Sequence, residues 1–121
     1  MLARALFVLL LFANGVCSGA TLSPAEEAKI QFLIASVETL SGAQFVRNGV
    51  AYDGKAAAEH LRIKRQRAGS RIRTADEFIT LCASMSSVSG TPYLIRFADG
   101  HTVNAGDYLR QRLVELRPPT Q

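Results

Sequence analysis

A single histidine, His60, stands at the head of a basic run near the middle of this 121-residue chain. The run places six cations within twelve residues, and Glu59 is the acid that lies beside it in the sequence. An imidazole beside cations suits the binding of an anion, whereas acid–base catalysis usually needs a group that orients the ring. The six cations are Arg62, Lys64, Arg65, Arg67, Arg71 and Arg73.

His60 shares one face of a predicted helix with Lys64 and Arg67, because the spacings are four and three residues. Leu61 and neighbouring alanines mark the adjacent apolar stripe, so the ring lies at the border between core and solvent. It either donates to a backbone carbonyl as a structural strut or faces a groove and binds an anion. The structural interpretation is favoured, because no carboxylate is evident as an orienter. The nearby cations are expected to lower the pKa of His60 and keep it mostly neutral.

The basic run has three interpretations. A solvated helix face is favoured, because long basic side chains are ordinary on surfaces. A second interpretation is attraction to an anionic envelope component, since arginines bind phosphate and carboxylate well. Nucleic acid is disfavoured as a partner, because no interleaved aromatic residues offer a stacking platform. The residues proposed for a basic surface are Arg62, Arg65, Arg67, Arg71 and Arg73.

Other site chemistry has weaker support in the sequence. His60 and His101 are the two histidines, and no spacing resembles a metal site, a nucleophilic serine motif or a glycine-rich phosphate loop. We therefore assign no catalytic residue, metal or cofactor. Cys82 lies on an apolar helical stripe and is interpreted as a small buried hydrophobe, with a reactive or dimer-forming thiol as the alternative.

The first twenty residues have the layout of a secretory signal: Arg4, an apolar run, and small residues ending at Ala20. We expect residues 1–20 to be removed and 21–121 to form a single small domain that is periplasmic or extracellular. Cys17 would leave with the signal, so no internal disulfide is expected. No later segment is long and apolar enough to span a membrane.

Capping and turn residues predict the order of elements after the signal. This order predicts an α+β fold, with four helices packed on a small, largely antiparallel sheet built from two hairpins. The elements are a helix after Ser23, a hairpin at Asn48-Gly49, a helix from Asp53 through Ala68, a helix after Thr74, a loop over residues 86–92, a hairpin at Asp99-Gly100 and a helix from about Asn104 that stops before Pro118-Pro119.

Three motifs in this order resemble the YfeK-like proteins, small exported bacterial proteins with a domain of unknown function. The resemblance covers nearly the whole chain after the signal and implies an exported domain without an established activity. Ala43 and Met85 stand where many members carry a cysteine and a lysine, so no role of that thiol or amine is carried over. The motifs are Phe45-Val46-Arg47-Asn48-Gly49, Ala57-Ala58-Glu59-His60-Leu61-Arg62 with Lys64, and Ser89-Gly90 with Pro92-Tyr93.

From these motifs we predict that Arg47, His60, Lys64 and Tyr93 line a ligand-binding pocket. The loop 86–90 is interpreted as a connector, with an anion cradle helped by Arg47 or Arg96 as the alternative. The favoured function is a non-enzymatic binding or interaction module with a basic face for an anionic envelope partner. Two alternatives stay open: a small envelope-acting enzyme with His60 as acid or base, and a structural accessory that binds another envelope protein.

Overall fold

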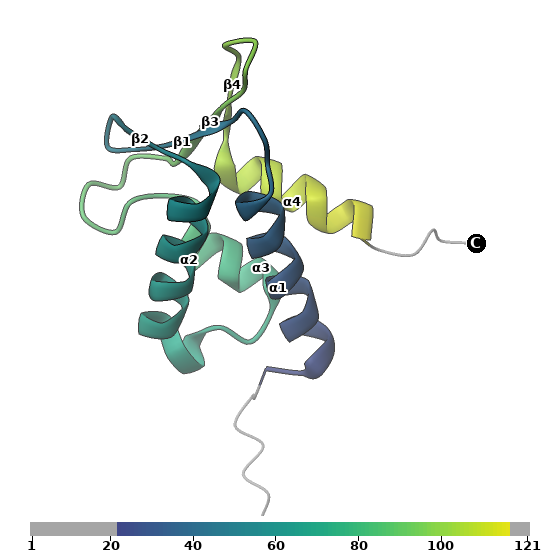
Figure 1. The fold of residues 1–121 in the computed structure, drawn as a ribbon. Coiled ribbons are helices and arrows are strands. Elements are labelled where there is room, and N and C mark those ends of the chain that lie inside the picture. The colour runs from purple at the N-terminus through teal and green to yellow at the C-terminus, as the bar shows by residue number, and fades with distance from the viewer. Residues whose placement is uncertain (1–21, 117–121) are drawn as a thin grey trace, which may run out of the picture.

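The computed structural model describes residues 22–116 (Figure 1). The predicted signal, residues 1–20, and the predicted stop at Pro118-Pro119 lie outside this range. The elements are α1 (Pro24–Glu38), β1 (Gln44–Arg47), β2 (Val50–Tyr52), α2 (Gly54–Ala68), a 3₁₀ turn (Gly69–Arg71), α3 (Ala75–Phe78), a π-helical turn (Ile79–Ala83), β3 (Leu94–Arg96), β4 (Thr102–Asn104) and α4 (Ala105–Leu116).

The four strands form one antiparallel sheet in the order β2-β1-β3-β4. Each hairpin supplies two neighbouring strands, and the pairing of β1 with β3 joins them. The first turn has positive φ at both Asn48 (50°) and Gly49 (77°), which is the geometry that these two residues predict. The sheet lies across one end of the α1–α2 pair, and the tip of the β3–β4 hairpin points away from the helices (Figure 1). The predicted α+β fold is confirmed.

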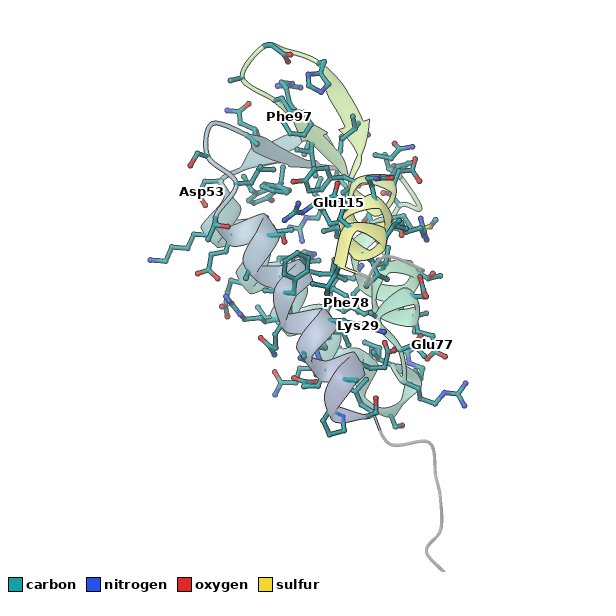
Figure 2. All side chains as sticks on the ribbon, turned by 90° about the vertical axis from the view of Figure 1, so that its right-hand side faces the viewer. Lys29, Asp53, Glu77, Phe78, Phe97 and Glu115 are labelled. Carbon is teal, nitrogen blue, oxygen red and sulfur yellow. The ribbon has the colours of Figure 1, made fainter. Side chains whose placement is uncertain are left out.

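Side-chain caps start the first two helices where the sequence predicts. The Ser23 hydroxyl accepts a hydrogen bond from the Glu26 amide (3.2 Å), and the Asp53 carboxylate accepts one from the Ala56 amide (2.8 Å). Asp53 lies where β2 passes into α2 (Figure 2). The second helix ends at Ala68, followed by a Gly69 with φ of 54°.

Gly54 places the start of α2 directly against the end of α1. A Cβ at this position would lie 2.6 Å from the Val37 carbonyl oxygen and 3.0 Å from that of Glu38. Because both neighbours are backbone atoms, a side chain here would force the two helices apart. This contact between helix ends fixes the position of α2, which carries His60 and Lys64.

The third helix differs from the prediction of a single α-helix. Thr74 caps it as expected and accepts a hydrogen bond from the Glu77 amide (3.1 Å), but after Phe78 the backbone widens into the π-helical turn. The Ser84 hydroxyl donates to the Ile79 carbonyl, five residues back, at 2.7 Å. The wider turn is compatible with full burial of Phe78 and Cys82, which are 0% and 1% exposed. Burial also raises the pKa of the Cys82 thiol.

The core lies between α1, α2, the π-helical turn and α4. No helix within residues 22–116 is long and apolar enough to cross a membrane. The largest fully buried side chains are Phe78, Ile30, Leu33, Ile34, Ile79, Ile95, Leu109, Val37 and Cys82.

Candidate functional site

The four residues predicted to line a pocket lie together. Arg47 is the last residue of β1, His60 and Lys64 lie one turn apart on α2, and Tyr93 comes directly before β3. The antiparallel pairing of β1 with β3 brings Arg47 and Tyr93, which adjoin the paired residues Val46 and Leu94, to the same end of the sheet, where the turn between β1 and β2 lies. The structure therefore places the residues as the hypothesis requires, and ligand binding itself stays a prediction.

Lys64 is the most deeply buried charged side chain among the described residues, with 9% of its surface exposed. Its Nζ donates to the Met85 carbonyl (3.1 Å) and to the Tyr93 hydroxyl (3.0 Å), and it lies 4.9 Å from the centre of the Tyr93 ring. An ammonium group has three donors, so one N–H has no acceptor within residues 22–116. No carboxylate of this part of the chain pairs with Lys64.

The Arg47 guanidinium contacts the His60 ring with one nitrogen. Nη1 lies 2.9 Å from Nδ1 and 3.0 Å from Nε2, while Nη2 donates to the Tyr52 hydroxyl (3.2 Å). The Nε2 of His60 lies 3.3 Å from the Tyr93 hydroxyl. The ring thus contacts side chains of the cluster formed by Arg47, His60, Lys64 and Tyr93. It does not contact the backbone carbonyl that the structural interpretation of His60 predicts.

Burial and positive charge both lower the pKa of His60 from its ordinary value of 6.5. Partial burial has the largest effect, followed by the charges of Arg47, Lys64 and Arg67. His60 is therefore neutral near pH 7, as the sequence predicts.

Acidification is expected to destabilise the protein through His60. Because the folded pKa lies below the unfolded one, the unfolded state binds more protons between the two values, and the free energy of unfolding falls as the pH falls below about 6.5. Urea unfolding at pH 7.5 and 5.5 would show a smaller loss for His60→Gln than for the wild type. His101→Gln, at an exposed position, is the control, and equal losses in all three proteins would contradict the prediction.

Two hollows meet at this cluster. The cationic groove has a volume of about 380 Å³, and the apolar chamber has a volume of about 160 Å³. Arg47, His60 and Tyr93 line both hollows. The groove is also lined by Asn48, Lys64, Arg67, Ala68, Arg71, Leu81 and residues 86–88, and the chamber by Val37, Phe45, Val46, Tyr52, Ala56, Ala57, Leu61, Ala83 and Ala105.

The loop after the π-helical turn is fixed to the first hairpin. The Ser86 hydroxyl accepts hydrogen bonds from the amides of Val88 (3.3 Å) and Ser89 (3.4 Å) and from the Asn48 side chain (3.2 Å). These amides are directed at Ser86, which leaves them poorly placed to cradle an anion. Arg96 lines neither hollow, so its predicted contribution to such a cradle is not seen.

The basic run divides into two sets. Carboxylates pair with three of its arginines. Arg62 contacts Glu38 of α1 and Glu59 of its own helix, Arg65 contacts Glu27 of α1, and Arg73 contacts Glu77 of α3. Of these carboxylates, Glu59 is the one that lies beside the start of the run in the sequence, because Glu27 and Glu38 lie on α1 and Glu77 follows the run. Arg67 and Arg71 have no ion-pair partner within residues 22–116, and both line the cationic groove.

Comparison with known proteins supports the predicted resemblance. A family described as a family of unknown function, DUF5329, matches residues 24–117. The chain belongs to the DUF5329 family. A curated relative, the uncharacterized protein YfeK of Salmonella typhimurium, is 41% identical over 68 residues. These residues cover 56% of this chain and 57% of YfeK, so the match spans little more than half of either protein. No solved structure matches the chain.

Proposed function

We propose that this DUF5329 protein is an exported, non-enzymatic module that binds an anionic envelope component in the cationic groove. One observation carries the proposal: three basic side chains, those of Arg47, His60 and Lys64, converge near the Tyr93 hydroxyl, and no carboxylate of residues 22–116 joins them. The layout of residues 1–20 supports export.

The energetics of Lys64 favour a ligand. A buried ammonium is costly unless it is paired and hydrogen-bonded, and here its neighbours are a carbonyl, a hydroxyl and an aromatic ring. An anion in the groove would supply the missing countercharge and accept the remaining N–H. The nearby Arg67 and Arg71 would raise the local concentration of anions.

Catalysis has less support than binding. Within residues 22–116 no carboxylate contacts His60, and no group of three metal-ligating side chains gathers. A neutral histidine held by Arg47 and Tyr93 lacks the orienting acid that general base catalysis usually uses. The broad basic face is also less favoured than the groove, because three of its arginines are already paired.

The proposal is tested by thermal unfolding of the purified protein with inorganic phosphate or sulfate, at low and high salt. We expect a rise in the midpoint temperature that grows with phosphate concentration and weakens with salt. Arg47→Met should remove this rise, whereas Arg96→Met, a matched change on the same sheet outside both hollows, should keep it. The absence of a rise in the wild type, or an equal rise in Arg47→Met, would refute the groove as an anion site.

A further inference from the structure

The cationic groove and the apolar chamber share a wall made of side chains. Arg47, His60 and Tyr93 each face both hollows. Arg47 and His60 are held by each other and by tyrosine hydroxyls, and no carboxylate within residues 22–116 contacts either of them. Small rotations of these two side chains would connect the hollows, so that one ligand could occupy both.

We propose that the ligand is a small amphipathic anion. Its charged head lies in the groove against Lys64 and Arg47, and its apolar group enters the chamber beneath the sheet. This inference rests on the proposed function and adds the chemical class of the ligand. Ligand sites of this kind combine an apolar lining with a few convergent polar groups, which is what the two hollows provide together.

Small side chains create the chamber. Four alanines line it, at positions 56, 57, 83 and 105, beside larger apolar residues such as Phe45 and Leu61. Apolar atoms that line a half-open hollow have fewer packing contacts than atoms of the core. An apolar group in the chamber restores those contacts, which gives the binding of the apolar part its own driving force.

The size of the chamber limits the apolar group. Its volume of about 160 Å³ is similar to that of an apolar cavity that admits benzene, so it suits about six carbon atoms. A long acyl chain would leave most of its carbons outside. The head can be a carboxylate or a phosphate, since arginine and lysine bind both. The inferred class is therefore a short-chain or single-ring carboxylate or phosphate ester.

Calorimetric titration of the purified protein with acetate, butyrate, hexanoate and octanoate tests the inference. We expect affinity to rise roughly fourfold for each added methylene up to about hexanoate and then to level off, because each buried methylene adds hydrophobic transfer free energy until the chamber is full. The affinity of hexyl phosphate, set beside that of hexanoate, shows whether the site prefers a phosphate or a carboxylate head. Hexylammonium, with the opposite charge, should not bind.

A filled chamber provides the decisive variant. Ala57→Leu should flatten the dependence on chain length and leave phosphate binding unchanged, because Ala57 lines the chamber and not the groove. Ala35→Leu makes the same change at an exposed position of α1 and should behave as wild type. If Ala57→Leu does not fold, Ala56→Leu, at an exposed position of the chamber lining, replaces it.

The outcomes separate this inference from the proposed function. If phosphate binds but affinity does not rise from acetate to hexanoate, the amphipathic ligand is refuted and the anion site stands. The same holds if affinity still rises with chain length in Ala57→Leu. Equal binding of hexanoate and hexylammonium would show that the head need not be anionic. If neither phosphate nor hexanoate binds, the groove is not an anion site and both proposals fail.

Discussion

Replacing Lys64 with methionine is expected to weaken anion binding by roughly 10- to 100-fold without destabilising the fold. The loss of affinity follows from the charge-assisted hydrogen bond that the ammonium would make to an anion, typically about 1.5–3 kcal/mol. Stability should be unchanged or higher by about 1–2 kcal/mol, because methionine fills a similar volume and removes a buried charge that no carboxylate in the described part of the chain pairs with. A side chain that binds a ligand and lowers the stability of the fold is typical of a functional site.

Two measurements on one variant check this prediction. Urea unfolding gives the free energy of unfolding without ligand, and calorimetry with phosphate gives the affinity. Lys55→Met is the matched control, because Lys55 is exposed on the same helix and lines neither the cationic groove nor the apolar chamber. We expect Lys55→Met to have the same free energy of unfolding and the same phosphate affinity as the wild type.

A purely structural role for Lys64 predicts the opposite result. In that case the bonds of its ammonium to the Met85 carbonyl and the Tyr93 hydroxyl would hold the loop against α2. Methionine would then leave both oxygens without this donor and lower the free energy of unfolding by about 1–3 kcal/mol. Such a loss, with phosphate affinity unchanged, would contradict the proposed function.

Local signals predicted the elements well. The caps Ser23, Asp53 and Thr74 act on amides within three residues, and the Asn48-Gly49 turn depends on the φ angles of those two residues alone. Such features need no knowledge of the rest of the chain. The π-helical turn escaped prediction because the apolar spacing of Phe78 and Cys82 fits an α-helix equally well.

The candidate site depends on contacts that are distant in sequence. Helical spacing predicted that His60 lies beside Lys64. Arg47 and Tyr93 join them only through the pairing of β1 with β3. All four residues were grouped from the sequence because they lie in the motifs that resemble the YfeK-like family. The apolar chamber was missed altogether. Its signal was the pair Ala56-Ala57, about one turn before His60, where small side chains leave space beside the histidine.

The sequence also did not reveal that carboxylates of α1 neutralise part of the basic run. Glu38 and Glu27 lie 24 and 38 residues away from the arginines that they pair with. Packing of α1 against α2 brings these carboxylates to Arg62 and Arg65, and no local pattern encodes that contact. The run therefore looked more strongly basic in the sequence than it is in the fold.

Replacing Phe78 with alanine is expected to have the opposite pattern of effects to the Lys64 substitution. Phe78 is fully buried where α3 passes into the π-helical turn, at the centre of the molecule (Figure 2). Its truncation leaves a cavity and should lower the free energy of unfolding by about 3–5 kcal/mol. Leu81→Ala, three residues further on at a position that is 40% exposed, is the control and should cost much less.

Phosphate binding is expected to distinguish Phe78, a core residue, from Lys64, a residue of the proposed site. Phe78 lines neither the cationic groove nor the apolar chamber, so at low temperature the folded Phe78→Ala protein should bind phosphate within about threefold of wild type. A stable Lys64→Met protein that does not bind, beside an unstable Phe78→Ala protein that does, would show that the cluster is maintained for a ligand and not for the fold. If Phe78→Ala loses binding while still folded, the π-helical turn must position the groove through Met85, whose carbonyl accepts from Lys64, and the site would extend into the core.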